Sequence, residues 1–409
     1  MNSTLFLMPM KIRLLTSALL LIVILAVLTS CNNKVGDSTP QYMRGGNSII
    51  SDGSNLVIAG YNSTSRGYDG TLLKVNASTG DTIWVKNYGG TFSDAFFNVQ
   101  KSKDIAGGYI TTGFSNNANG GSPSMVVLKT DANGKIIFSK IYGTGSYTEG
   151  FGIVPDSDSG YLAVGFIQKS GSSDRNIYLQ RIDDDGTGMW TRSIGATGSN
   201  PYDSINEVAY AVIAAPGGGY FLTGAFKAGF SMEGGQIFLM KVAANGDSLW
   251  TKRYGTGFGY ALTLTKDGNI AISGSIVKGS NQDVFLLKTD LSGNLLWTNP
   301  SIKTFGGAGF EYGASMIETS DAGFAITGIT ESVTNGLQDV YFVKTNSLGD
   351  QTYEKNFGES DNEQGYGLIQ TSDNYFYITG LSNSGGSYIY LNKLDLNNGQ
   401  VSGWPKNFE

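Results

Sequence analysis

The sequence predicts an all-β protein, and three observations carry that prediction. Glycine accounts for 58 of 409 residues and charged residues for only 15%, which favours tight turns between short strands over solvated helices. A strand-like run that ends in glycine recurs seven times, at intervals of 50 to 59 residues. Each is followed by an apolar run with a basic residue, a glycine turn and an aromatic strand. Together they predict a seven-bladed β-propeller of four-stranded antiparallel blades.

The start of the chain is expected to be an export signal rather than part of the fold. Lys11 and Arg13 precede an apolar run, residues 14–29, which is shorter than the roughly 20 residues of a membrane span. The run leads into LTSC, which resembles the lipobox of bacterial lipoproteins. That resemblance implies that Cys31 is lipidated and becomes the mature N-terminus. Because Cys31 is the only cysteine, an intramolecular disulfide is excluded.

This interpretation predicts three segments of the chain and a cellular location. Residues 1–30 are expected to be a lipoprotein signal peptide, residues 31–44 a flexible tether from the lipidated cysteine, and residues 45–409 the propeller. The lipid anchor would hold the protein on a membrane of the bacterial cell envelope. The outer membrane is favoured, and both periplasmic and surface exposure stay open. A net charge of -6 argues against a nucleic acid partner.

The order of strands within a unit is predicted from side-chain size. In most units the first run carries two small residues two positions apart, such as Gly150 and Gly152, and the second unit departs with Ala95 and Phe97. Because alternate residues of a strand share one face, such a run suits the crowded axis of a ring. The glycine-ending run is then second, the basic run third and the aromatic strand outermost. The first and last units are complete, which predicts closure without an exchanged strand.

The outermost strand carries the most specific motif of the repeat. All five tryptophans occupy one slot in it: Trp84, Trp190, Trp250, Trp297 and Trp404. Runs around this slot, such as NASTGDTIW and KVAANGDSLW, resemble the outer-strand tryptophan motif of PQQ-like propeller repeats. The whole unit is also similar to the repeats of surface propeller lipoproteins from Bacteroidetes-type bacteria. The resemblance spans residues 45–409 and implies that the tryptophans lock neighbouring blades together.

The resemblance says little about activity. Its quinoprotein dehydrogenase relatives are usually longer and eight-bladed, and they carry a vicinal cysteine pair. Seven units and one cysteine therefore disfavour a quinone enzyme. Another relative is the propeller lipoprotein of the outer-membrane β-barrel assembly machinery, which is a protein-binding accessory.

The absence of histidine narrows the available chemistry. Ser-His-Asp and Cys-His nucleophile systems and His-ligated zinc or iron are excluded. Acidic residues lie one or two positions ahead of the first strand in five units: Asp94, Glu149, Glu207, Glu311 and Glu363. They are expected to accept backbone N–H groups or to pair with lysines, with a calcium site or acid–base action on a glycan as alternatives. No catalytic residue and no metal site is assigned, and calcium is the one cofactor left open.

Two further repeated positions are expected to be structural. The third strand carries a basic residue in every unit, whose stem would pack while its charged end reaches an acid or a backbone carbonyl: Lys74, Lys129, Arg181, Lys241, Lys288, Lys344 and Lys393. The first strand carries an aromatic residue between the small ones in most units: Phe96, Phe151, Tyr210, Tyr260 and Tyr366. Packing between blades is the favoured role for these rings, and a sugar-stacking platform at the channel mouth is the alternative.

Loop length selects the candidate ligand contacts. The connections from a fourth strand to the next first strand are long at residues 196–207 and 298–310. Variable loops on a rigid scaffold are a common place for recognition residues. The candidate ligand-binding residues are therefore those in these loops, together with the acids at the channel mouth: Tyr202, Asp203, Glu207, Lys303, Phe305, Phe310, Glu311 and Glu363.

The predicted function is a membrane-anchored lipoprotein whose propeller is a non-enzymatic binding or scaffold module for protein or glycan. A carboxylate-dependent polysaccharide hydrolase or lyase is one alternative. An accessory subunit of an envelope assembly complex is the other.

Overall fold

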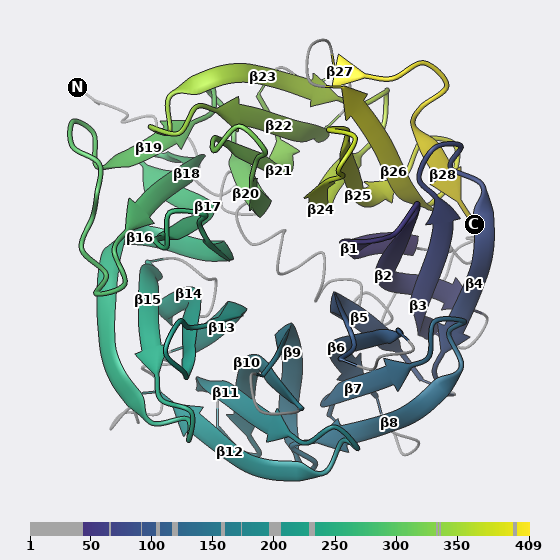
Figure 1. Ribbon diagram of the computed structural model, residues 1–409, viewed down its shortest axis with the longest axis vertical. Helices are drawn as coiled ribbons and strands as arrows, with labels where there is room; N and C mark the ends of the chain where they lie inside the picture. Colours follow the sequence, from purple (N-terminus) through teal and green to yellow (C-terminus); the bar gives the residue numbers. More distant parts are fainter. Residues whose placement is uncertain are drawn as a thin grey trace, which may run out of the picture.

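The described part of the chain forms strands and turns arranged as a ring around a central channel (Figure 1). The computed structural model describes residues 44–64, 67–90, 92–103, 107–116, 122–156, 160–172, 174–195, 206–228, 234–332, 334, 337–395 and 399–409. Within these ranges there is no helix, and hence no helix long and apolar enough to cross a membrane. The proposed signal peptide, Cys31 and most of the tether lie outside the described residues.

The strands follow the chain in order, four to a blade, from the axis outwards. Blade one comprises β1 (Arg44–Asp52), β2 (Asn55–Thr64), β3 (Gly67–Asn76) and β4 (Thr82–Tyr88). Blade two comprises β5 (Asp94–Lys101), β6 (Tyr109–Ser115), β7 (Ser124–Thr130) and β8 (Ile136–Tyr142). Blade three comprises β9 (Ser146–Pro155), β10 (Tyr161–Lys169), β11 (Arg175–Ile182) and β12 (Gly188–Ile194). Blades four and five share the long strand β16 (Ser248–Leu264), which is the outer strand of one and the inner strand of the other.

The remaining strands complete four blades. Blade four contains β13 (Asn206–Ala214), β14 (Tyr220–Ala228) and β15 (Gln236–Val242), and blade five contains β17 (Ile270–Lys278), β18 (Asn281–Thr289) and β19 (Ile302–Phe305). Blade six is β20 (Glu311–Glu318), β21 (Phe324–Thr330), β22 (Asp339–Thr345) and β23 (Gln351–Phe357). Blade seven is β24 (Glu363–Gln370), β25 (Phe376–Ser382) and β26 (Tyr388–Asp395), whose outer edge pairs with β27 (Gly399–Gln400) and β28 (Lys406–Phe408). The predicted seven-bladed fold is confirmed.

The ring closes where blade seven meets blade one. Strand β1 packs against β24, β25 and β26, and the C-terminal strand β28 pairs with β26 of its own blade. Among the described residues, no strand of one blade is supplied by the other end of the chain. Closure without an exchanged strand therefore agrees with the prediction.

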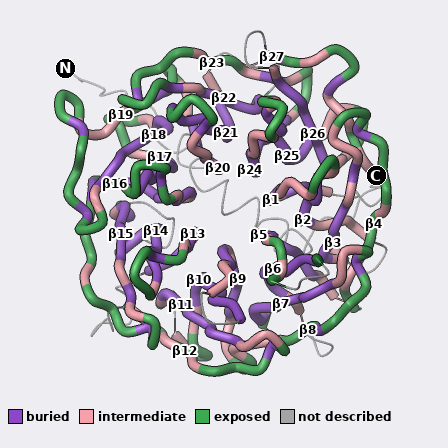
Figure 2. Tube along the Cα trace, in the orientation of Figure 1, coloured by how far each residue is buried: buried purple, intermediate pink, exposed green. Residues whose placement is uncertain are grey.

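The second and third strands are buried on both faces, since each blade is covered by a neighbour on either side (Figure 2). This is why β7 reads SMVVLKT, with every residue buried, rather than alternating apolar and polar residues. Apolar side chains from two adjacent blades form each cluster of the core, as where Ile58 and Leu73 meet Tyr377 and Leu391. Each such aliphatic side chain stabilises the fold by about 1.5–3 kcal/mol. The blades are therefore held mainly by their shared core.

A β-bulge in each inner strand explains the glycine that ends each second strand. The register between these strands shifts by one residue at the bulge, as between Gly365 and Gly367 opposite Gly380. A Cβ atom on any of the seven second-strand glycines would overlap a carbonyl oxygen of the inner strand. In blade seven that oxygen belongs to Gln364. Glycine is thus required opposite the bulge, and the bulge turns one extra side chain towards the axis.

The small residues of the inner strands make room for the second strand of the preceding blade. The hydroxyl of Thr112 donates to Val126 O (2.9 Å), and a Cβ atom on Gly150 would overlap this hydroxyl. The same relation joins the pairs Thr223 and Gly259, Thr327 and Gly365, and Thr379 and Gly46. The small residues therefore reflect close packing between blades rather than a ligand.

The aromatic residue of each outer strand lies against the next blade. In that next blade a glycine follows the third strand. A Cβ atom on this glycine would lie between 2.6 and 3.3 Å from the aromatic side chain. The seven pairs run round the whole ring: Trp84 and Gly134, Phe138 and Gly186, Trp190 and Gly246, Trp250 and Gly293, Trp297 and Gly349, Tyr353 and Gly399, and Trp404 and Gly80. Trp297 and Trp404 differ from the expectation in one respect, because each precedes its short outer strand instead of lying within it.

Candidate functional site

Side chains from all seven blades meet at the central channel. The bulge residue of each inner strand lines a cavity of about 340 Å³ there, together with the two or three residues that follow it. These bulge residues, hereafter the axial residues, are Asn47, Phe97, Phe151, Tyr210, Tyr260, Ala314 and Tyr366. Five of the seven are aromatic.

Blade two corrects the predicted register of this position. Phe97 is the axial residue there, and Phe96 is 2% exposed in the core that blades one and two share. The bulge lies between Phe96 and Asn98, so these two residues correspond to the small pair of other blades. Ala95 was misleading because its size fits the small slot, although it lies one position too early.

Four of the axial rings form a continuous aromatic arc over blades two to five. The centroids of Phe97 and Phe151 lie 5.2 Å apart, those of Phe151 and Tyr210 5.2 Å, and those of Tyr210 and Tyr260 4.9 Å. Neighbouring rings are tilted by 31° to 53°. Ala314 of blade six ends the arc and leaves the ring of side chains asymmetric.

The cavity wall is uncharged but not purely apolar. None of the described residues that line it is acidic or basic. Asn47 donates from Nδ2 to Phe96 O (2.8 Å), and Asn98 Oδ1 accepts from Ile153 N (3.4 Å). Tyr210 Oη is buried and not open to the cavity, and it has no hydrogen-bond partner among the described residues. Burial also raises the pKa of this hydroxyl, so it stays protonated and remains a donor.

Three of the predicted acids brace the turns that enter the inner strands. Asp94, Glu311 and Glu363 each accept the backbone N–H of the residue four positions earlier, at 3.2, 3.0 and 2.8 Å. They are 5%, 0% and 2% exposed. Burial raises the pKa of Asp94 to about 6, and it also raises that of Glu363. These carboxylates therefore hold the entry turns, as one of the two predicted roles requires.

Glu149 lies in different surroundings from these three acids, whereas Glu207 keeps their position, two residues before Ala209, which is opposite Gly224. Thr148 takes the turn-bracing position of blade three and donates to Tyr142 O (3.1 Å), which leaves Glu149 on the other face of β9. Glu149 is fully buried and accepts Tyr147 Oη (2.5 Å), and burial raises its pKa to about 7. Glu207 is 1% exposed in β13 and lies against Gly195.

The third-strand basic residues point away from the channel and hold turns. Lys74, Arg181, Lys288 and Lys344 each pair with an aspartate in the turn between the first two strands of their own blade, at 2.5 to 2.8 Å. Lys129 pairs with Asp184 of the next blade (2.8 Å), and Lys241 donates to Gly218 O (2.8 Å). Lys393 lies 4.0 Å from the ring centroid of Tyr375. The predicted structural role is confirmed for the first six residues, and Lys393 differs because its charged end lies over aromatic rings.

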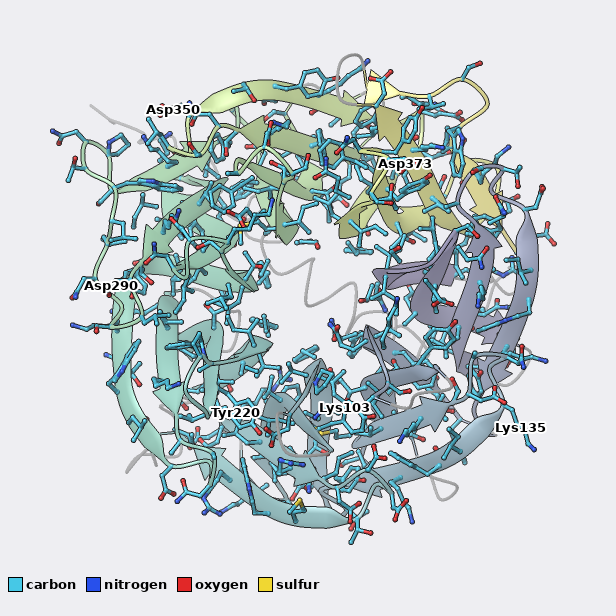
Figure 3. The ribbon with its side chains drawn as sticks, in the orientation of Figure 1. Lys103, Lys135, Tyr220, Asp290, Asp350 and Asp373 are labelled. Carbon is cyan, nitrogen blue, oxygen red and sulfur yellow. The ribbon has the colours of Figure 1, made fainter. Side chains whose placement is uncertain are left out.

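The candidate loop of blade five is not where the sequence placed it. Lys303 and Phe305 lie in β19, the outer strand, and the insertion precedes this strand, because the chain turns after Trp297 before it pairs with β18. Lys303 Nζ contacts Asp350 Oδ1 (2.9 Å) at the outer rim seen in Figure 3, and Phe305 is 5% exposed in the core. The backbone oxygen of Phe310 accepts Glu331 N (3.0 Å). None of these three residues lines the cavity.

The other candidates divide between the cavity surroundings and the undescribed ranges. Tyr202 and Asp203 lie outside the described residues. Glu207, Glu311 and Glu363 lie near the axis but not in the cavity wall. In the described segments, no group of three acidic side chains is arranged to hold a metal ion.

A second basic set escaped the sequence reasoning. It lies two residues after the outer aromatic in six blades: Lys86, Lys140, Arg192, Lys252, Lys355 and Lys406. The stems of five of them pack beside that aromatic on the next blade, as Arg192 does beside Trp190: Lys86, Arg192, Lys252, Lys355 and Lys406. Lys303 is the member from blade five, displaced by the insertion. The constant spacing from the aromatic was the available signal.

Comparison with known proteins supports the fold. No family model matches the chain, and neither does any curated protein. Among solved structures, the Dos1 propeller is 11% identical with a TM-score of 0.50 and covers 90% of this chain and 86% of its own. Pyrococcus horikoshii acylaminoacyl peptidase is 10% identical with a TM-score of 0.50, over 89% of this chain and 52% of the peptidase. A protein of unknown function from Bacteroides caccae is 14% identical with a TM-score of 0.43, over 79% and 98%. The chain is similar to β-propellers in architecture.

Proposed function

We propose that this protein is a lipid-anchored, non-enzymatic binding module of the bacterial cell envelope that takes a protein or glycan ligand on its propeller. The observation that supports it most is the axial cavity, which presents five aromatic rings and no charged side chain. Concave, largely apolar sites with a few polar groups are typical of binding sites.

The placement of the carboxylates supports binding over catalysis. A glycan-cleaving enzyme needs two carboxyl groups that face the substrate. Glu207, Glu311 and Glu363 are at most 2% exposed, and the last two are bonded to backbone N–H groups. The peptidase among the similar structures shares the propeller architecture at 10% identity, which carries no argument about activity.

The lipid anchor and the repeat family are part of the same proposal. The LTSC sequence before Asn32 supports lipidation of Cys31, and the outer-strand tryptophan slot supports kinship with PQQ-like and Bacteroidetes-type propeller lipoproteins. The outer membrane is the favoured location for such an anchor.

Fractionation of cells that express the full chain tests the anchor. The wild-type protein is expected in the membrane fraction with a covalently attached fatty acid, and Cys31→Ser is expected to lose both. Ser30→Ala, which keeps the cysteine, is the matched control. A Cys31→Ser protein that stays in the membrane fraction would contradict the anchor.

Incubation with polysaccharide tests the non-enzymatic assignment. The purified full-length protein is expected to release no reducing ends from envelope or plant polysaccharides. Release that disappears in Glu311→Gln would overturn the assignment in favour of a hydrolase or lyase.

A further inference from the structure

The volume of the cavity fits one ring-shaped group of a ligand and the group attached to it. Its volume of about 340 Å³ lies at the lower end of the ~300–1,000 Å³ of ligand pockets. It is somewhat more than twice the ~150 Å³ of a cavity that accommodates benzene. A folded protein domain cannot enter such a space, whereas the end of a chain-like ligand can.

The absence of charge in the wall limits the ligand to a neutral group. Among the described residues no lysine or arginine lines the cavity, so a phosphate, a sulfate or a sugar acid would lose its hydration without a counter-ion. The described lining also contains no acidic side chain, which disfavours an amine or a basic peptide side chain. The buried acids nearby are bonded to their own turns or strands.

The aromatic arc offers a curved stacking surface. Phe97, Phe151, Tyr210 and Tyr260 come from four different blades, and each contacts the next at 4.9 to 5.2 Å between centroids. Each ring is turned to the axis by a bulge, which is a feature that often re-aims side chains at binding sites. Rings that line a cavity can stack on the C–H face of a flat, partly apolar ligand.

Polar groups in the same wall favour a ligand that carries hydroxyl groups. Asn47 commits its Nδ2 to Phe96 O, and its Oδ1 has no partner among the described residues. The side chains of Asn98, Gln100 and Ser315 also line the cavity. A purely apolar side chain would leave such groups unsatisfied.

We propose that the axial cavity binds a neutral saccharide ring, stacked on the arc of Phe97, Phe151, Tyr210 and Tyr260 and hydrogen-bonded by Asn47. This inference rests on the proposed function, because it names the ligand class of the same propeller. A glycan chain would enter end-on along the axis, with one sugar ring seated in the cavity. Ala314, which ends the arc, leaves room for a substituent or the next sugar.

Calorimetric titration of the full-length protein tests the ligand class. The probes are cellopentaose, xylopentaose, mannopentaose, maltopentaose and chitopentaose, with pentagalacturonic acid as the charged comparison. At least one neutral oligosaccharide is expected to bind, and the charged one at least tenfold more weakly. If no neutral member binds at millimolar concentration, or the charged one binds best, the saccharide assignment is overturned.

Variants of the arc test the location. Phe151→Leu keeps apolar volume but removes the stacking face, and a loss of affinity of about tenfold is expected. Tyr260→Phe keeps the ring, so at most a threefold loss is expected. Tyr388→Ala, which removes an aromatic residue outside the cavity, should bind as wild type. Equal affinity in Phe151→Leu and wild type would overturn the site.

Two other outcomes separate this inference from the proposed function. If a neutral hydrophobic peptide such as acetyl-Gly-Phe-Gly-amide binds, no oligosaccharide does, and Phe151→Leu weakens the peptide, the saccharide class is wrong while non-enzymatic binding stands. If an oligosaccharide is cleaved during the titration, non-enzymatic binding itself is wrong.

Discussion

The outer belt of the ring and its axis follow the same sevenfold repeat. The side chains of the outer belt are all aromatic, whereas those at the axis vary. At the outer belt every blade places an aromatic side chain against a turn glycine of the next blade, and only tryptophan, phenylalanine and tyrosine occur there. At the axis the bulge backbone is repeated in every blade, yet its side chain changes from Asn47 to Phe97, Tyr210 and Ala314. A position that is uniform in all blades is explained by closure of the ring. A position with uniform backbone and varied side chains is free to be shaped for a ligand.

The largest expected effect lies at the bulge that both regions depend on. Gly328→Ala would drive a Cβ atom into Tyr312 O, so the bulge of blade six cannot form. We expect a loss of about 3–5 kcal/mol in the free energy of unfolding, or failure to fold. Urea unfolding followed by tryptophan fluorescence measures it. Gly90→Ala, where nothing lies within 4 Å, is the control and should change stability by less than about 0.5 kcal/mol.

The outer belt should respond strongly to loss of a single aromatic residue. Trp190→Ala removes the side chain that packs on Gly246 and contacts Arg192, and we expect a loss of about 2–3 kcal/mol. The neighbouring Met189 is 59% exposed, so Met189→Ala should be close to neutral. Equal unfolding midpoints for the two variants would contradict the role of the aromatic residue in joining blades.

Two groups of acids should make the free energy of unfolding depend on pH in opposite directions. They are the buried acids near the axis and the aspartates in the ion pairs of the turns. Burial raises the pKa of Glu149 to about 7 from a model-peptide value of 4.5. The unfolded chain therefore loses this proton first, and stability falls as pH rises from about 4.5 to about 7. In Glu149→Gln the free energy of unfolding should fall by about 2 kcal/mol less between pH 4.5 and 8 than in the wild type. An unchanged slope would mean that Glu149 is ionised when folded.

The turn aspartates show the other sign. Burial opposes the shift, but hydrogen bonds from Lys344 and Thr319 hold the pKa of Asp321 at about 2. Its contribution is present above the unfolded value of 3.8 and is lost as pH falls towards about 2. Asp321→Asn should lower stability slightly at pH 7 and make no difference at pH 2. Because this aspartate is largely exposed, solvent screening keeps the effect small.

The sequence predicted the parts of the fold that repeat with a fixed spacing. The seven glycine-ending strands and the tryptophan slot set the blade count, and the small pairs such as Gly150 and Gly152 placed the inner strand at the axis. The bulge was not predicted, because one extra residue opposite Gly165 leaves no change in spacing along a single strand. That is why the axial ring of blade two was assigned to Phe96 instead of Phe97.

The candidate site was predicted less well than the fold, for a physical reason. The repeat predicts Lys303 and Phe305 to be loop residues because it places Trp297 in the outer strand, whereas the strand forms after an insertion. The carboxylates were correctly placed near the channel, but burial of their side chains follows from the neighbouring blade and cannot be read from one repeat. The axial aromatics were identified, with packing between blades preferred over sugar stacking.

The aromatic arc is expected to contribute less to stability than the outer belt. Phe151→Leu keeps apolar volume beside the cavity, so its unfolding free energy should fall by less than about 1.5 kcal/mol. Circular dichroism against temperature measures this change, and Trp190→Ala serves as the comparison. A larger loss in Phe151→Leu than in Trp190→Ala would show that the axis also holds the ring together.

Binding by these same two variants tests the division between belt and axis most directly. The affinity of the best neutral oligosaccharide would be measured by titration calorimetry on full-length Phe151→Leu and Trp190→Ala at a temperature where both are folded. The account predicts about a tenfold loss in Phe151→Leu and wild-type affinity in Trp190→Ala. Wild-type affinity in Phe151→Leu, or an equal loss in both variants, would contradict it.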